Sequence, residues 1–353
     1  MHEGELLFSL VFFFVVFILL ILDLGVFTRT DHEITTREAA IWTFTWVMLA
    51  FGWLEFLVWF GDRLHSITSM EKLIEVTTLY GQHIKIIPGD LAGSLVHYRN
   101  LISLEFLSGY LVEYSLSIDN IFVMILIFSA FGVKKNLFHR VLFWGILGAV
   151  VFRFIFIFAG AYMVSRFSWI LYIFAAFLVY TGIDLFLKRN KKEAVDKEHH
   201  PVVRFASKVF PVHKKFEGNK FFISIDGKKY ITPLFLVLLV IEFSDIIFAV
   251  DSIPAIFAVT RDPYIVFFSN IFAILGLRSM FFLLMNVVDK LRFFKHGLSL
   301  LLIFIGLKMI FDEPLKHIGF TIVHSLLVIT LILAASISLS LLFPKKPDDE
   351  KST

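Results

Sequence analysis

The stretch "GYLVEYSLSIDNIFVMILIF" (residues 109–128) decides the fold class of this chain. It is apolar enough to cross a membrane, yet it contains two acids, Glu113 and Asp119. A charged side chain at the centre of a membrane helix costs roughly 2.5–3.5 kcal/mol on insertion scales, so such residues usually face one another or a wet cavity. The stretch therefore predicts a membrane helix whose acids serve a function.

The composition of the whole chain indicates an integral membrane protein. Of its 353 residues, 58% are hydrophobic and 18% are charged, which is more apolar side chain than a soluble core can bury. The chain has no Cys, which excludes disulfides and thiolate metal sites. A span needs roughly 20 apolar residues. A window of that length predicts an all-α polytopic fold with nine spans, near residues 6–27, 39–60, 101–131, 137–164, 168–187, 233–259, 264–288, 297–311 and 318–343.

Basic residues predict how the spans are oriented. With the N-terminus outside, 23 Lys and Arg fall on the cytoplasmic side and 7 on the other, which is the asymmetry that cytoplasmic loops carry. The C-terminus is then cytoplasmic. The predicted organisation is two N-terminal spans (1–60), an extracytoplasmic loop (61–100), a first three-helix repeat (101–187), a basic cytoplasmic loop (188–232), a second three-helix repeat (233–312), and a last span with a cytoplasmic tail (313–353).

The cytoplasmic loop has two elements of its own. "VVRFASKVF" (202–210) has apolar residues at helical spacing beside Arg204 and Lys208, which predicts a short helix lying on the membrane face. "FFISIDGKKYIT" (221–232) has two extended runs around Asp-Gly, which predicts a β-hairpin. Neither has the spacing of a catalytic motif, so we expect a structural or gating role.

Two segments of the chain resemble each other. "EYSLSIDNI" (113–121) and "DIIFAVDSI" (245–253) share an acid, five residues, an Asp, a small polar residue and Ile. An arginine follows on the next span of each copy, Arg153 and Arg278, and a glycine follows on the span after that. Three spans is an odd number, so the second copy must cross the membrane in the opposite sense. The sequence therefore predicts that the third to fifth spans (101–187) and the sixth to eighth spans (233–312) are two inverted repeats with a site at the midplane. This is the plan of secondary transporters.

Polar side chains of the two repeats gather on helix faces. Glu113 and Asn120 are seven residues apart and share a face, as do Asp245 and Ser252. Glu242 lies one turn before Asp245. Each helix thus offers a broad polar wedge. The candidate metal ligands are Glu113, Asp119, Asn120, Glu242, Asp245, Asp251 and Ser252.

The chemistry of these ligands favours hard cations. Pro254 has no N–H to give to the carbonyl of Val250, so that oxygen is free beside Asp251. Carboxylate, amide, hydroxyl and carbonyl oxygens suit Mg²⁺, Ca²⁺ and Mn²⁺, whereas Cu⁺ and Zn²⁺ favour sulfur or imidazole. Acids that converge without a cation would repel one another and retain protons. Exchange of a cation for protons is the resulting hypothesis.

Other ionisable residues within the predicted spans have simpler interpretations. Arg153 and Arg278 either neutralise acids in a structural network or take part in gating. Glu105 and Asp184 lie near the ends of their spans, and we expect them to be solvated flanks. Asp23 and Glu55 lie outside the repeats. The pattern is equally compatible with a role of these two acids in helix pairing and with their membership of the site.

Long motifs of this chain resemble one family of bacterial membrane proteins. They are "ILDLGVF" (21–27), "GYLVEYSLSIDNIFVMILIF" (109–128), "RVLFWGILGAVVFR" (140–153) and "TPLFLVLLVIEFSDIIFAVDSIPAIFAVTRDPYIVFFSNIFAILGLRSMFF" (232–282). The chain is similar to the TerC family and most like its Alx-like branch. The resemblance covers most of the chain except 61–100.

The resemblance implies more than the residues alone. It implies location in the bacterial cytoplasmic (inner) membrane and export of Mn²⁺ from the cytoplasm, with links to tellurite resistance and alkaline-pH response in some members. It places the family's motif acids on the five candidate acids above. It places the polar partners on Asn120, Ser252 and Asn270. Manganese follows only from the resemblance, and Mg²⁺ or Ca²⁺ are compatible with the ligand chemistry.

Three functional classes fit these patterns to different degrees. The leading one is a secondary transporter, not an enzyme, with a divalent metal ion as transported substrate, no permanently bound cofactor and no nucleic-acid partner. The second is a membrane scaffold or assembly factor linked to tellurite or metal stress, in which the loop 188–232 recruits partners. The third, an intramembrane hydrolase, fits poorly because the chain has no H-E-x-x-H or G-x-S-x-G run. The oligomeric state stays open.

Overall fold

The structure is a computed structural model that describes residues 10–12, 14–19, 35–167, 169–188, 200–213, 215–225, 227–285 and 293–343, without the side chains of Lys188, Asp251 and Lys316. The long helices are α2 (Thr36–Phe60), α4 (Leu91–Phe131), α5 (Lys135–Arg166), α6 (Ile170–Lys188), α8 (Pro233–Phe257), α9 (Pro263–Leu275), α11 (Phe294–Ile310) and α13 (Ile322–Leu342). Shorter elements are η1 (Gly61–His65), α3 (Met70–Leu79), α7 (Pro201–Val209), β1 (Phe222–Ile225), β2 (Lys228–Ile231), α10 (Leu277–Leu284) and α12 (Asp312–His317).

Local sequence signals set the helix ends. The Asp90 side chain caps α4 by accepting a hydrogen bond from the Gly93 amide at 2.9 Å, and Gly132 ends the same helix in the left-handed conformation with φ of 64°. Thr232 and Asp262 cap α8 and α9, and each is followed by proline at the first helical position. Helix α4 therefore begins at residue 91, ten residues before the predicted span, and the loop before it is correspondingly shorter.

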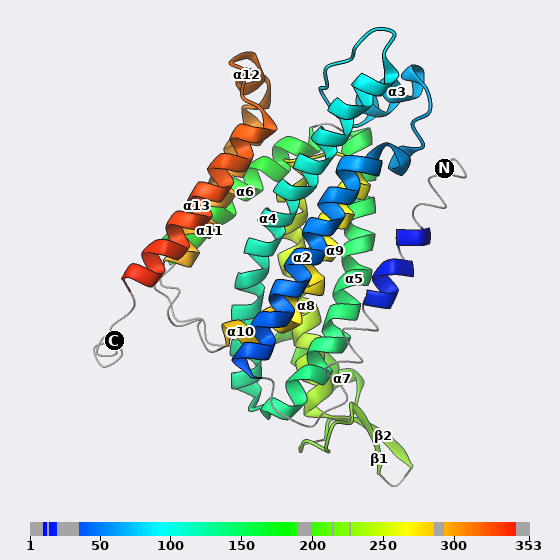
Figure 1. Ribbon diagram of the computed structural model, residues 1–353. Coiled ribbons are helices and arrows are strands. Elements are labelled where there is room, and N and C mark those ends of the chain that lie inside the picture. The colour runs from blue at the N-terminus through cyan, green and yellow to red at the C-terminus, as the bar shows by residue number, and fades with distance from the viewer. Residues whose placement is uncertain are drawn as a thin grey trace.

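Successive helices run up and down the bundle, so the connections alternate between its two ends (Figure 1). One end carries α3 and the α8–α9 turn, residues 258–262, and we call it the α3 end. The other carries α7 and the β1–β2 hairpin, and we call it the hairpin end. The two long polar segments of the sequence thus lie at opposite ends of the molecule, as the predicted alternation of spans requires.

The protein is a multi-pass membrane protein, but nine spans are not confirmed. Within the described residues, six helices are long and apolar enough to cross a membrane, or seven if α9 and α10 form one span. The predicted span 6–27 and Asp23 lie largely outside the described residues. The predicted span 297–311 is α11, whose 17 residues fall short of the roughly 20 that a straight span needs. The predicted span 264–288 is bent by 43° between α9 and α10 at Gly276.

Helix α9 lies inside the bundle. Every residue from Ile265 to Leu275 is buried, and α9 packs against α2, α4 and α5. A helix that is apolar on all sides belongs in the interior, which is where the run of Ile, Val, Phe and Ala places this one. The only strongly polar side chain in its buried run is Asn270, and its amide is therefore held against other helices.

The predicted elements at the hairpin end are confirmed. Strands β1 and β2 pair antiparallel, from Phe222 opposite Ile231 to Ile225 opposite Lys228, and Asp226 of the turn lies outside the described residues. Helix α7 packs on α8 through Ala206, whereas Phe205 is 71% exposed on the neighbouring face. This exposed apolar face is compatible with the predicted position on the membrane surface.

Candidate functional site

Arg153 joins four helices in the middle of the bundle. Its Nη1 forms an ion pair with Glu113 Oε1 of α4 and donates to Asn270 Oδ1 of α9 at 3.0 Å. Its Nη2 lies 3.3 Å from Asp245 Oδ1 of α8. All four side chains are buried. The structure thus brings together an acid from each predicted repeat, one arginine and one asparagine, and we call these four residues the Arg153 network.

Several polar atoms in and beside the Arg153 network have no hydrogen-bond partner among the described residues. They include one oxygen of each acid, Glu113 Oε2 and Asp245 Oδ2. The others are Ser117 Oγ, Asn120 Nδ2, Ser252 Oγ and Asn270 Nδ2. A buried polar atom without a partner costs about 1–3 kcal/mol, more if it is charged. The two carboxylate oxygens and the two serine hydroxyls can face a cation, whereas the two amide nitrogens are donors and cannot.

Glu242 approaches the same region from one turn earlier on α8. It is partly buried, and its Oε2 has no hydrogen-bond partner among the described residues. Its carboxylate lies directly against the backbone of Gly148 on α5, in the space that a Cβ at that position would fill. The absence of a side chain at Gly148 therefore makes room for the Glu242 carboxylate.

The remaining predicted site residues have different positions. Asp119 is half-buried and lies six residues beyond Glu113, so it projects about 120° around α4 from that acid. Asp251 belongs to α8, but its side chain lies outside the described part of the chain. Pro254 lies within α8, which continues to Phe257, so the helix does not end there. Arg278 is buried on α10.

No three-ligand metal cluster is found within the described ranges. In that part of the chain, no group of three or more His, Asp or Glu side chains lies close enough together to hold a metal ion. Glu113 and Asp245 instead share the Arg153 guanidinium, and the Asp251 side chain is not among the groups described. In this conformation the arginine supplies the positive charge between the two acids.

Sequence comparison identifies the family. Residues 98–348 match the model of the family described as "Integral membrane protein TerC family". The chain belongs to the TerC family. Members similar to it include the "Uncharacterized membrane protein STKORF319" of Myxococcus xanthus, 44% identical over 93% of this chain and 91% of the relative.

Two further relatives carry a functional name. The protein called "Putative membrane-bound redox modulator Alx" is 41% identical in Photorhabdus laumondii, over 90% of this chain and 90% of the relative. Its counterpart in Escherichia coli K12 is 39% identical over 91% of this chain and 92% of the relative. No solved structure matches the chain. The expected resemblance to the Alx-like branch of the TerC family is confirmed.

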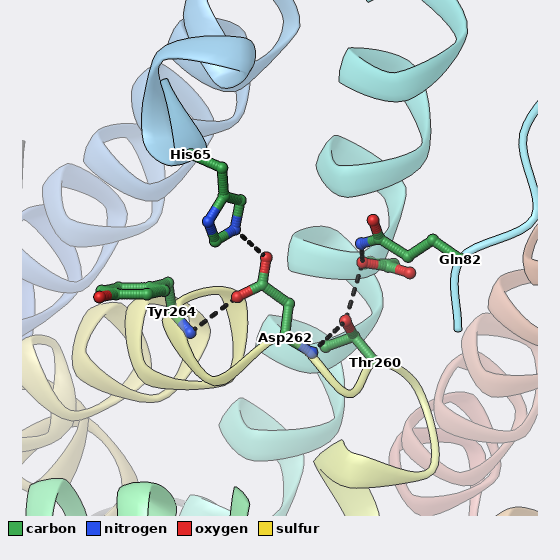
Figure 2. Close-up of polar contacts among 6 residues, drawn as sticks. His65, Gln82, Thr260, Asp262 and Tyr264 are labelled. Atoms are coloured by element: carbon green, nitrogen blue, oxygen red, sulfur yellow. Dashed lines mark hydrogen bonds and ion pairs between the residues drawn. The ribbon is translucent and has the colours of Figure 1, made fainter. Parts of the chain in front are cut away.

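This TerC protein has a second buried polar cluster at the α3 end, which sequence reasoning missed (Figure 2). His65 Nε2 lies 2.7 Å from Asp262 Oδ2, and Asp262 Oδ1 accepts from the Tyr264 amide at 3.0 Å. Beside this pair, Glu105 Oε2 accepts from Thr260 Oγ1 at 2.8 Å and from Gln82 Nε2 at 2.9 Å. Glu105 is 5% exposed, so the expectation of a solvated flank is wrong, because Gln82 from the loop before α4 and Thr260 from the α8–α9 turn pack against it.

The sequence contained only part of the signal for this cluster. Asp262 followed by proline is a recognisable helix start, and in the structure Asp262 is the N-cap of α9. His65 and Gln82 lie in a polar segment without strong periodicity, so nothing local indicated that they enter the bundle. Their partners lie 197 and 23 residues away, at distances that only the packed fold defines.

Proposed function

We propose that this protein is a secondary transporter, not an enzyme, that exports divalent metal cations, Mn²⁺ foremost, from the cytoplasm in exchange for protons. One observation carries the proposal. Glu113 and Asp245 come from different predicted repeats, meet at Arg153 in the interior, and each keeps one buried oxygen without a hydrogen-bond partner among the described residues. Acids inside a membrane helix bundle are functional candidates by default.

The helix contacts support the proposed inverted repeats. If α4, α5 and α6 correspond to α8, α9 and α11, the corresponding helices run in opposite directions through the bundle (Figure 1). The exchange turns the α4–α9 contact into the α8–α5 contact, and both are present. The α4–α8, α5–α9 and α6–α11 contacts each join a helix to its own counterpart, so the exchange leaves them unchanged, and all three are present. The Arg153 network would then lie at the interface of the repeats, where secondary transporters place their substrate.

We assign the hairpin end to the cytoplasm and the α3 end to the outside of the inner membrane. The basic residues support this, because the loop 188–232 at the hairpin end is the most basic segment of the chain. Cytoplasmic loops of bacterial membrane proteins carry such an excess of Lys and Arg. Export then moves the ion from the hairpin end toward the α3 end.

The chemistry of the network supports a hard divalent ion as substrate. Carboxylates, hydroxyls and amide oxygens are hard ligands, and Mn²⁺ accepts them more readily than Cu⁺ does. In the described conformation Arg153 neutralises both acids. We propose that this guanidinium moves aside when the metal binds and returns when the metal leaves, so that the acids never face each other without a positive charge. A tethered cation of this kind would keep the empty transporter stable.

The relatives' name is compatible with this proposal. A protein that modulates redox state needs a redox-active group or control over one, and this chain has no Cys that could form a thiol–disulfide couple. Control of the cytoplasmic concentration of a transition metal would change redox chemistry indirectly. We therefore interpret the redox effect in that name as a consequence of metal export.

Reconstitution tests the assignment. Purified protein in proteoliposomes should carry Mn²⁺ across the bilayer, measured with a metal-quenched dye inside the vesicles. Glu113→Gln and Asp245→Asn remove one charge each from the Arg153 network, and we expect each to lower Mn²⁺ flux at least about tenfold, by loss of more than about 1.4 kcal/mol of binding. Glu55 is exposed on α2, so it is not a member of the buried site, and Glu55→Gln is the matched control. Equal flux in all four proteins would reject the site.

The second candidate function is a membrane scaffold, favoured by the exposed apolar face of α7. Phe205 and Val209, 71% and 54% exposed, share that face and lie beside the hairpin. In a scaffold this surface would recruit a partner, and the acids would only hold helices together. Deletion of residues 200–232 would then abolish the cellular phenotype while Mn²⁺ binding by the purified protein persists. Loss of transport in acid variants that retain this loop favours the transporter.

A further inference from the structure

Residues 61–90 form a cap over the α3 end, and two side chains from the cap enter the bundle (Figure 2). His65 comes from η1 and binds Asp262 in the α8–α9 turn. Gln82 comes from the segment after α3 and donates to Glu105 of α4. All four side chains are buried. The cap is therefore anchored to α4 and to the α8–α9 turn, at the end of the bundle that we assign to the outside.

Glu105 differs from the neighbouring acids in its partners. Asp262 lies against a histidine, and Asp62 accepts a hydrogen bond from Arg99 Nε at 2.6 Å. Glu105 is held by two neutral donors, the Gln82 amide and the Thr260 hydroxyl, which both use Oε2. Within the described ranges no Lys, Arg or His nitrogen lies within ion-pair distance of its carboxyl group. A buried carboxylate with only neutral donors is held in place but not neutralised.

A proton is the ligand that fits such a group, because a buried carboxyl without a cation favours its uncharged form. We propose that Glu105 is the counter-ion site of this protein, at which a proton from outside binds before it moves inward to the Arg153 network as the metal leaves. In this step an O–H bond of a hydronium ion outside breaks as one forms at the Glu105 carboxylate, and the Glu105 O–H bond then breaks as the proton passes to a carboxylate oxygen of the Arg153 network, without transfer of electrons. The proposal rests on the proposed transport function.

The charged groups that face Glu105 come from three elements. Asp262 in the α8–α9 turn carries the same sign of charge as an ionised Glu105, and Lys308 on α11 carries the opposite sign. Lys308 Nζ also donates to the Ala258 carbonyl at 3.2 Å. On its own helix, Tyr98 lies two turns nearer the outside, and its buried hydroxyl has no hydrogen-bond partner among the described residues. Of the groups around Glu105, Gln82 belongs to the cap, so a movement of the cap that removes the Gln82 hydrogen bond would change how well the Glu105 carboxylate is stabilised.

The position of Glu105 along α4 fits a relay. It lies eight residues before Glu113 on the same helix, which is about 12 Å along the axis. The two acids project within roughly 80° of each other, on one broad face that also carries Asn120. Ser108, one turn inward from Glu105, is buried, and its hydroxyl has no hydrogen-bond partner among the described residues. A carboxyl thus stands between the outer cap and the Arg153 network.

Two transport modes test the proposal. Wild type, Glu105→Gln, Glu105→Asp and the control Glu55→Gln are reconstituted as full chains in proteoliposomes. Net Mn²⁺ flux driven by a pH gradient needs proton binding, whereas exchange of labelled for unlabelled Mn²⁺ at equal pH does not. We expect Glu105→Gln to lower gradient-driven flux at least about tenfold and exchange by less than about twofold. Glu105→Asp keeps the carboxyl and should retain part of the gradient-driven flux. A parallel loss of both modes in Glu105→Gln, or no loss of either, would overturn the proposal.

A second measurement remains decisive if the protein does not transport Mn²⁺ at all. Infrared difference spectra of purified wild type and Glu105→Gln, recorded during a pH titration, report protonated carboxyl groups directly. We expect the variant to lack one carboxyl band that titrates in the wild type. Identical titrations would refute proton binding at Glu105 whatever the transport result. Absence of Mn²⁺ flux in wild type in both modes would instead refute the transport function.

Discussion

Gly182 of α6 and Gly306 of α11 occupy equivalent positions in one helix contact. A Cβ on Gly182 would lie 2.7 Å from Ile303 Cγ1 and 2.9 Å from the Ser299 carbonyl, which are three and seven residues before Gly306. A Cβ on Gly306 would lie 2.7 Å from Val179 Cγ2 and 2.8 Å from the Ala175 carbonyl, which are three and seven residues before Gly182. Each glycine thus faces the residues three and seven positions before the other glycine. A two-fold axis that relates two antiparallel helices produces this reciprocal arrangement.

This reciprocity predicts equal effects of two substitutions. Gly182→Ala and Gly306→Ala each place a methyl group against backbone, and we expect each to lower the free energy of unfolding by about 1–3 kcal/mol. The double variant should lose less than the sum, because one substitution already separates the helices at both positions. Thermal unfolding in detergent measures this. Gly52→Ala on α2 is the matched control, since nothing beyond the neighbouring backbone of its own helix lies within 4 Å of its Cβ position.

Arg153→Met tests whether this side chain stands in for a bound metal. It leaves Glu113 and Asp245 buried without their shared cation, and removal of one partner from a buried ion pair costs about 3–5 kcal/mol. We expect a lower Tm that saturating Mn²⁺ restores, with a larger shift than in wild type because the metal replaces the lost charge. Arg166→Met, on the exposed end of α5, is the control. An equal Mn²⁺ shift in all three proteins would place the metal elsewhere.

The space at Gly148 predicts a selective effect on the candidate site. Gly148→Ala must displace the Glu242 carboxylate, which is the end of a flexible side chain, so the fold should survive. If Glu242 is a metal ligand, Mn²⁺ affinity should fall at least about tenfold, or about 1.4 kcal/mol, in a binding titration. Gly145→Ala lies one turn away on α5 and meets only Ile241 at 3.5 Å. Unchanged affinity in Gly148→Ala would remove Glu242 from the site.

The His65–Asp262 pair predicts how firmly the cap is held. Asp262→Ala removes the N-cap of α9, at about 1 kcal/mol, and leaves a buried histidine nitrogen without its partner, at about 1–3 kcal/mol, so we expect both losses in the unfolding free energy. Limited proteolysis should then cut within 61–90 before the rest of the chain. Asp90→Ala, which removes the N-cap of α4 but no buried partner, should cost only about 1 kcal/mol. Equal protection of the cap in both variants would show that the pair does not hold it.

Prediction from sequence succeeded where the signal was local. The helix at 201–209 and the hairpin at 222–231 follow from spacing and turn residues that lie within a few positions of one another. The pairing of Arg153 with acids was one of two interpretations, and the structure shows an ion pair with Glu113. Gating by Arg153 stays a prediction. The bend at Gly276 was not located in advance, because a single glycine in an apolar run is compatible with a straight helix as well as with a bent one.

The amino-acid sequence by itself determined the membrane class, the long helices and the oxygen-rich chemistry of the acids, because hydropathy, helical period and ligand type are properties of neighbouring residues. Only the tertiary structure decided that Arg153 binds Asn270, 117 residues away, and that Glu105 is buried beneath a cap. Rotation of each helix about its own axis is set by packing against helices distant in the chain. That rotation selects which polar side chains meet, and a one-dimensional pattern does not fix it.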